Sequence, residues 1–366
     1  MHQTIPHKTS VNALFFTIVA FAIIFVYSND KILVYEIKTD KLLAMANGFN
    51  PDDVKDLKWK NIDVGTHWAK RDSHEIYECN NELYLFGGLD ADGTFVNGLP
   101  DYTKAKYYND IWKTADGINW TQVSEHSNLP LLRSMSIVPF KDKIYLLNGW
   151  GPEVGLNKYI WTTSDCVNWE KSSVKPNFPT REGDRTLAAK GKLYMFGGVS
   201  YEQHKTFNDV WISDDGLNWK ELVKNAPWHS RWDHDVAYFN NKFILYGGMD
   251  IGDIGFSDLW TSKDAINWEL ITANSEMGAR QGQVLASYKN VSFLVGGLDA
   301  KTNLGESDTW FTFNGRDWQK LKNNGLWAPR EDHRVAVFND MLLLYGGMND
   351  KWEWQGDSWA IPLNFF

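Results

Sequence analysis

WISDDGLNW, residues 211–219, has four close copies in this chain of 366 residues. The copies are WKTADGINW from Trp112, WTTSDCVNW from Trp161, WTSKDAINW from Trp260 and WFTFNGRDW from Trp310. In chain order the first tryptophans are 49, 50, 49 and 50 residues apart, and Trp359 follows after 49 more. A fixed period of this length is typical of repeat architectures. The spacing therefore predicts six repeats of about fifty residues each.

Each repeat has the pattern of four short strands. In the third repeat, TLAAK and KLYMFGG flank a tight turn at Lys190-Gly191, and DVWIS and LNWKELV flank Asp215-Gly216. Two-residue turns of this kind between apolar runs are hairpin signals. The diglycine-like pairs follow the same rhythm: Gly87-Gly88, Asn148-Gly149, Gly197-Gly198, Gly247-Gly248, Gly296-Gly297 and Gly346-Gly347. Four strands per repeat predict an all-β, six-bladed β-propeller.

The order of apolar run, Gly-Gly, loop and paired aromatic residues resembles the kelch repeat, over residues 57–361. The resemblance implies a kelch-type propeller of the galactose-oxidase superfamily. That family contains enzymes, such as galactose oxidase and a sialic-acid mutarotase, and many binding modules. The resemblance therefore predicts the fold and leaves the function open.

The ends of the chain predict how the ring closes. The sixth repeat stops soon after its third strand, whereas WKNIDVGTHWAKRDSH from Trp59 aligns with WKELVKNAPWHSRWDH from Trp219. Pairing the two chain ends in one sheet would remove an open edge. We expect residues 57–64 to be the outer strand of the sixth blade. The predicted domains are a signal anchor or signal peptide at 1–28, a linker at 29–56 and the propeller at 57–366.

The N-terminus contains an apolar run of 17 residues from Val11 to Tyr27. Its length and lack of a polar face predict a hydrophobic helix, either a retained membrane anchor or the core of a cleaved signal peptide. The first alternative makes the membrane a partner through residues 11–27. Both place the propeller outside the cytoplasm, membrane-anchored in one case and secreted or periplasmic in the other.

Composition narrows the function classes. A net charge of -9 and a pI near 5.5 argue against a nucleic-acid partner, which needs a basic stripe. Cys79 and Cys166 fall at non-equivalent points of the repeat, so we expect no disulfide between them. The chain has no phosphate loop, zinc spacing or nucleophile elbow, and we expect neither a cofactor nor a metal.

An arginine opens every blade, at Arg71, Arg133, Arg181, Arg231, Arg280 and Arg330. Because a ligand without sixfold symmetry does not need six copies of one residue, this repetition indicates a role in the fold. A histidine follows three residues later at His74, His234 and His333, but the aligned positions elsewhere are Ser136, Asp184 and Gln283. Variation at this position leaves room for specificity.

Topology places these arginines on one face. The links between blades lie beside the loops that join second and third strands, on what we call the top face. The longest of these loops contains the insert LDADGTFVNGLPDYTKAKYY at 89–108. Because loops on a rigid scaffold usually carry the binding groups, we expect a ligand site there. The candidate residues are Arg133, Arg280, Arg71, Arg181, Arg231, Arg330, Trp232, His234, His333, Trp150, Tyr107, Trp352 and Trp354.

The arginines predict a positive top face that favours an anion. Arg133 and Arg280 have no Asp or Glu in the next three residues, so we expect their guanidinium groups to be free. The first hypothesis is a module that binds a carbohydrate or a protein. The alternatives are a sugar-modifying enzyme, such as a sialic-acid-type mutarotase or epimerase, and a structural adhesion scaffold. Acid–base chemistry would then use the top-face carboxylates Glu182, Asp184, Asp233, Glu331 or Asp332.

Overall fold

The computed structural model describes residues 14–18, 21–28, 31–38, 51–65, 67–299 and 302–363. Within those ranges, strands dominate, and the helical elements are α2 (Pro51–Lys55) and the short 3-10 helix η1 (Tyr201–Gln203). Neighbouring strands of the sheets run antiparallel.

Six four-stranded sheets form the body of the described chain, and we number them in chain order. Sheet 1 contains β5 (Glu75–Cys79), β6 (Glu82–Phe86), β11 (Ile111–Thr114) and β12 (Thr121–Ser124). Sheet 2 contains β13 (Ser136–Phe140), β14 (Lys143–Leu147), β17 (Trp161–Thr163) and β18 (Glu170–Lys171). Sheet 3 contains β19 (Arg185–Ala189), β20 (Lys192–Phe196), β23 (Val210–Ser213) and β24 (Trp219–Val223).

The remaining three sheets repeat this order. Sheet 4 contains β25 (Trp232–Phe239), β26 (Lys242–Met249), β27 (Leu259–Ser262) and β28 (Trp268–Thr272). Sheet 5 contains β30 (Val284–Tyr288), β31 (Val291–Val295), β34 (Thr309–Thr312) and β35 (Gln319–Lys320). Sheet 6 contains β36 (Arg334–Phe338), β37 (Met341–Tyr345), β38 (Ser358–Pro362) and, from the other end of the chain, β4 (Lys60–Asn61).

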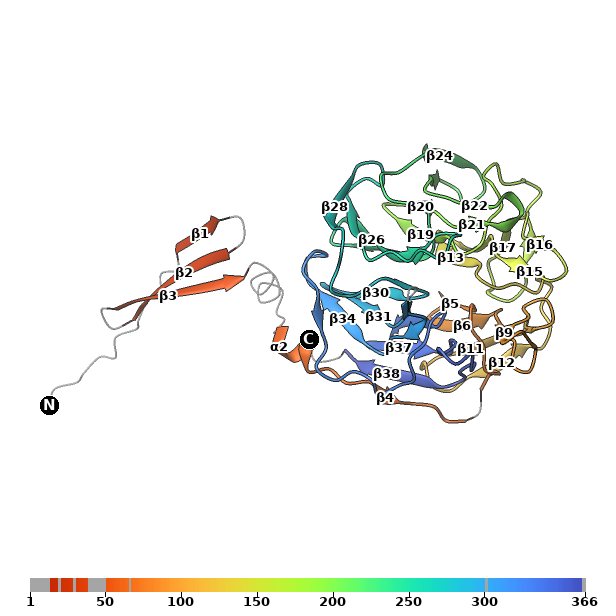
Figure 1. Ribbon diagram of the computed structural model, residues 1–366, viewed down its shortest axis with the longest axis horizontal. Helices are drawn as coiled ribbons and strands as arrows, with labels where there is room; N and C mark the ends of the chain where they lie inside the picture. Colours follow the sequence, from red (N-terminus) through yellow and green to blue (C-terminus); the bar gives the residue numbers. More distant parts are fainter. Residues whose placement is uncertain are drawn as a thin grey trace.

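The sheets are arranged as the blades of a β-propeller (Figure 1). The first strands lie side by side in the order β5, β13, β19, β25, β30 and β36, and β36 lies in turn beside β5. In sheet 6, Trp359 and Ala360 of β38 pair with Asn61 and Lys60 of β4. The buried residues Val54, Leu57 and Trp59 add to the core beside sheets 5 and 6.

The core lies between neighbouring sheets, which explains the apolar runs. Second strands such as β6, β20 and β37 are buried along nearly their whole length, since a sheet packs on each of their faces. Fourth strands such as β12 and β18 are largely exposed. One core cluster, for example, packs Phe86 of sheet 1 against Leu146 of sheet 2.

The predicted N-terminal helix is wrong. The residues of the run that the structure describes lie in β1 (Leu14–Ile18) and β2 (Phe21–Ser28), which join β3 (Lys31–Lys38) in a three-stranded sheet. Within the described ranges, no helix is both long enough and apolar enough to cross a membrane, which overturns the predicted membrane-anchored location. The run is rich in Val, Ile and Phe, which favour extended backbone, and KILVYEIK at 31–38 supplies a paired strand.

The expectation of two free cysteines is wrong as well. Cys79, at the end of β5, forms a disulfide with Cys166, and their Cα atoms are 6.1 Å apart. Cys166 stands in the turn between the third and fourth strands of sheet 2. This turn packs on the preceding sheet, where the Tyr77 hydroxyl donates to the Cys166 carbonyl oxygen at 2.9 Å. Non-equivalent points of the repeat therefore meet across the boundary between sheets 1 and 2.

Candidate functional site

Five of the six arginines form one recurring structural clamp. Arg231, for example, is fully buried, and its Nη1 donates to the Gly247 carbonyl oxygen at 2.9 Å and to Asp258 Oδ1 at 2.7 Å. Its Nη2 donates to Asp258 Oδ2 at 2.8 Å. The same bidentate geometry joins Arg71 to Asp110, Arg181 to Asp209 and Arg330 to Asp357. Arg280 pairs with Asp308 mainly through Nη1, and its Nη2 donates to the Met277 carbonyl oxygen. These arginines hold loops of the fold in place.

Arg280 does not have the free guanidinium that we expected. It is 3% exposed, and its Nη1 lies 2.7 Å from Asp308 Oδ1. The acidic partner in each clamp stands two residues before the tryptophan of the third strand, far beyond the three residues that the sequence expectation considered. In sheet 4, Trp260 Nε1 also donates to Asp258 Oδ2, at 2.6 Å. The Asp-x-Trp spacing was the signal in the sequence that could have revealed this pair.

Arg133 is one residue out of register with the other five. The carbonyl of Leu132, not of Arg133, accepts a hydrogen bond from Gly88 N at 2.9 Å, as the Arg231 carbonyl does from Gly198 N at 2.8 Å. Arg133 instead forms an isolated β-bridge with Trp150, and Glu182 forms the equivalent β-bridge with Val199. Sheet 2 also has Tyr159 where the others have the clamp aspartate. Arg133 is therefore free of the clamp and lies at the top of the ring.

This shift also corrects the alignment of the histidine position. Met135, and not Ser136, takes the place in sheet 2 that a histidine takes in sheets 1, 4 and 6. A Cβ added at Gly87 would meet the Met135 side chain, just as one at Gly197 would meet the His234 ring.

The histidines belong to the core. His74, His234 and His333 are at most 5% exposed, and each lies beside a buried tryptophan, with ring centroids 5.7, 6.2 and 6.1 Å apart. Burial lowers the pKa of His333 to about 3 and lowers the pKa of the other two well below the ordinary value. Among the described residues, no group of three or more His, Cys, Asp or Glu side chains is placed to hold a metal ion. The histidines are therefore neutral packing residues at neutral pH.

A ring of backbone hydrogen bonds surrounds the axis at the top. Six residues with left-handed backbone, φ between 48° and 61°, each donate from N to the carbonyl oxygen of the preceding member. The donor–acceptor distances are 3.0–3.2 Å, and the cycle returns to its start. Its members are Ser73, Ser134, Gly183, Asp233, Gly282 and Asp332. The ring links the starts of all six sheets around the axis. The residue that precedes each ring member in the chain, such as Arg133 before Ser134, lies at the upper edge of the ring.

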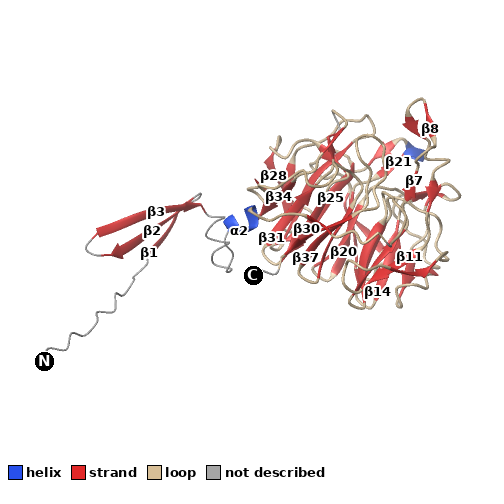
Figure 2. Ribbon diagram, turned by 90° about the horizontal axis from the view of Figure 1, so that it is seen from below, coloured by secondary structure: helices blue, strands red, loops and turns tan. Residues whose placement is uncertain are grey.

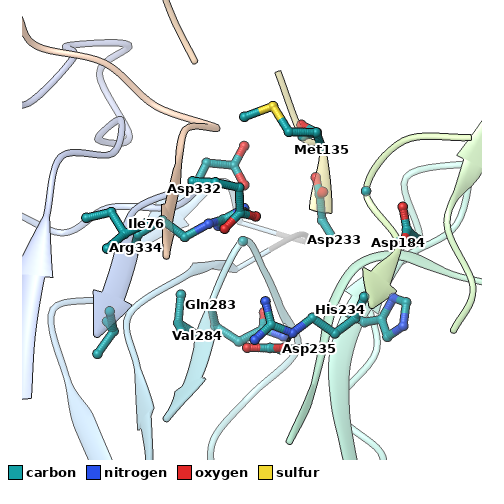
Figure 3. Close-up of a pocket in the computed structure, with 16 residues that line it drawn as sticks. Ile76, Met135, Asp184, Asp233, His234, Asp235, Gln283, Val284, Asp332 and Arg334 are labelled. Carbon is teal, nitrogen blue, oxygen red and sulfur yellow. Dashed lines mark hydrogen bonds and ion pairs between the residues drawn. The ribbon is translucent and has the colours of Figure 1, made fainter. Parts of the chain in front are cut away.

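A cavity of about 90 Å³ lies along the axis at this ring (Figure 3). Two ion pairs span its wall between neighbouring sheets, Arg334 Nη2 to Glu75 Oε1 and Arg185 Nε to Asp235 Oδ1, both at 2.8 Å. Asp184 accepts hydrogen bonds from Thr186 and Asn148, yet burial raises its pKa to about 6. The cavity is therefore polar and rich in carboxyl groups.

The mouth of the cavity is acidic. We define the axial mouth as Asp72, Glu182, Asp233, Glu331, Asp332 and Arg133. Burial is the largest influence on the pKa of each of these carboxyls, and all five pKa values are raised. The negative charge of Asp332 raises the pKa values of the other four further. The predicted positive top face is wrong, since five arginines are neutralised in clamps and five carboxyls face one arginine.

Aromatic residues of the top loops form a wall around Arg133. Its guanidinium lies 4.8 Å from the Tyr102 ring centroid and 5.3 Å from that of Trp150, and Nε is 3.2 Å from Glu182 Oε2. Tyr107 packs against Trp150 with 6.0 Å between the ring centroids. These residues come from the insert and from the strand pairs β7 (Leu89–Asp90) with β10 (Lys106–Tyr107), and β15 (Trp150–Gly151) with β16 (Gly155–Leu156).

The structure thus separates the predicted site residues into two groups. Arg133, Tyr107, Trp150, Trp352 and Trp354 meet around one side of the mouth, the last four in a cluster with Met348. Trp232 lies outside this group and packs against Tyr201, with ring centroids 5.9 Å apart. Tyr102 and Tyr201 were missing from the predicted set, although Tyr102 stands in the insert at 89–108 that was expected to carry the site. The other five arginines lie in the clamps and the three histidines are buried beside tryptophans, although His234 also lines the cavity.

These features define a β-propeller whose top face departs from its own repeat at one side of the axis. The chain belongs to the kelch-repeat family: residues 134–347 match the KLHDC2/KLHL20/DRC7 Kelch-repeats domain. The family resemblance of the sequence is confirmed. A comparison with curated proteins finds no match.

Proposed function

We propose that residues 57–366 form a closed, six-bladed propeller that binds a ligand through its top face. The pairing of β4 with β38 and the cycle of backbone hydrogen bonds around the axis support closure. A closed ring holds six loops in fixed positions, so a ligand meets a preorganised surface.

The single observation that carries the binding proposal is the position of Arg133. The other five arginines are each paired with an aspartate in a clamp. Arg133 is instead displaced to the axial mouth, where Tyr102, Trp150 and Glu182 surround it. A structural role common to all sheets does not account for this departure. Kelch domains commonly bind proteins, and a mixture of aromatic and charged groups suits a protein surface. We propose a protein ligand as the first candidate.

Affinity capture with matched variants tests this function. Wild-type protein, a top-face variant and a control are used as bait, and the captured proteins are quantified by mass spectrometry. The top-face variant is Arg133→Ala/Trp150→Ala, and the control is Lys192→Ala at an exposed ion pair with Asp214 in the turn on the opposite face. A partner retained by the control and lost with the top-face variant supports the proposal. Equal capture by all three baits contradicts it.

A carbohydrate is the second candidate ligand, because aromatic faces beside hydroxyl and carboxyl groups suit sugar rings. A neutral sugar fits the acidic mouth better than the acidic sugar that a positive face would have favoured. The pKa of Asp184, raised to about 6 by burial, would allow that carboxyl to exchange protons near neutrality, as a mutarotase requires. Anomer-exchange NMR on neutral sugars tests this alternative. An exchange rate equal to that of buffer excludes it for those sugars.

A further inference from the structure

The axial mouth contains five carboxyl groups and one guanidinium group. Arg133 forms its ion pair with Glu182, and Arg334, below the ring, forms its own with Glu75. In the described part of the chain, no lysine or arginine lies within ion-pair distance of Asp72, Asp233 or Glu331. Carboxylates that repel one another in a partly dry site stabilise a cation placed among them.

Two neutral polar groups at the same mouth are also unsatisfied. Gln281 donates from Nε2 to Glu331 Oε2 at 2.9 Å, which leaves its buried Oε1 without a hydrogen-bond partner. The Tyr107 hydroxyl, on a residue that is 8% exposed, has no partner either. This phenol lies on the ring that packs against Trp150, and the same Trp150 ring faces the Arg133 guanidinium. Buried polar groups are normally hydrogen-bonded, so these atoms indicate a polar group that binds at the mouth.

The rim around the mouth is apolar. Large apolar side chains are exposed in the top loops of five sheets, including Leu99 at 59%, Ile254 at 59% and Leu304 at 59%. Others are Phe95, Val154 and Tyr201. Phe95 and Leu99 lie on the hairpin of β8 (Phe95–Val96) and β9 (Leu99–Pro100), which stands out from the ring (Figure 2). An apolar rim about a charged centre marks a surface for a partner.

We propose that the ligand of the top face is a basic protein segment, with a lysine or arginine side chain in the axial mouth and apolar neighbours on the rim. This inference rests on the proposed binding function and names the chemistry of its partner. The cation pairs with Asp72, Asp233 and Glu331, and the aromatic wall of Tyr102 and Trp150 adds cation–π stabilisation. Burial raises the pKa values of these carboxyls, their mutual repulsion raises them further, and a bound cation relieves that repulsion.

The test uses the full chain and arrayed capped heptapeptides. Their flanks are randomised among apolar and small residues, and the central residue is fixed as Lys, Arg, norleucine or Glu. We expect the Lys and Arg sets to bind roughly tenfold more tightly than the norleucine set, and the Glu set to bind least. Asp233→Asn/Glu331→Gln should remove most of the preference for Lys. The control, Asp214→Asn/Glu269→Gln, removes the same charge from exposed positions away from the mouth and should keep the preference.

Four results would overturn the inference: equal binding of the Lys and norleucine sets, preference for Glu, no binding by any set, or a preference for Lys that survives Asp233→Asn/Glu331→Gln. The proposed function is judged separately with Phe95→Ser/Leu99→Ser on the rim. If peptides bind without preference for Lys but are lost in this rim variant, top-face protein binding stands and only the basic chemistry fails.

Discussion

Replacing Arg231 with alanine should destabilise the fold far more than replacing Arg133. Arg231 is fully buried, and its guanidinium donates to Asp258, to the Gly247 carbonyl and, through Nε at 3.0 Å, to the His229 carbonyl. It also stacks 4.3 Å from the Phe256 ring centroid. The substitution leaves two carbonyl groups and a carboxylate without their donor.

The expected loss follows from the burial of the pair. Removing one partner of a buried ion pair costs about 3–5 kcal/mol. The Asp258 side chain is 12% exposed and keeps its hydrogen bond from Trp260, so we expect the lower half of that range. Burial alone would raise the pKa of Asp258, but the hydrogen bond and charge of Arg231 hold it below the ordinary value. Arg280→Ala should behave like Arg231→Ala, because Arg280 forms the same clamp with Asp308.

Arg133→Ala should cost about 1–2 kcal/mol, since Glu182 can be protonated when its partner is lost. Urea denaturation at pH 7, followed by tryptophan fluorescence, measures the free energy of unfolding of all three variants. The double variant Arg231→Ala/Asp258→Ala should lose less than the sum of the single losses, because the pair is removed together. A loss below about 1 kcal/mol for Arg231→Ala would refute the clamp. So would an equal loss for Arg133→Ala.

Three further outcomes are expected. Deleting residues 1–66 should abolish cooperative unfolding, because it removes β4 and the buried Trp59, whereas deleting 1–45 should not; identical melting of both truncations would contradict closure by the N-terminal strand. Cys79→Ser should lower the free energy of unfolding by about 2–5 kcal/mol, because 87 residues separate the two cysteines, and a reducing agent should affect only the wild type. Asp233→Asn should stabilise the protein at pH 7–8 but not below pH 4. Burial and the charge of Asp332 raise the pKa of Asp233 in the folded protein, so the free-energy cost of ionising this carboxyl grows as the pH rises above its pKa in the unfolded chain. Equal urea midpoints of the variant and the wild type at pH 7.5 would contradict this.

The sequence by itself determined the class of fold. The fifty-residue period, the hairpin turns and the apolar runs are local features, and a β-propeller of the kelch-repeat family was predicted from them and is confirmed. Repetition of the arginine also indicated a role in the fold, although the sequence did not show that Arg280 shares that role and that Arg133 does not. These inferences depend on the strand period and the turns, which neighbouring residues decide.

Tertiary structure alone decided which groups meet. Arg280 and Asp308 are 28 residues apart in the chain and 2.7 Å apart in the fold, and Cys79 joins Cys166 across a sheet boundary. The one-residue shift at Arg133 is visible in the positions of Leu132 and Met135, and Tyr159 in place of the clamp aspartate was the sign of it in the sequence. The charge of the axial mouth likewise depends on which arginines are already paired. Side-chain pairing between strands distant in sequence is set by the register of the sheets, and hydrophobic pattern does not specify that register to a single residue at the loops.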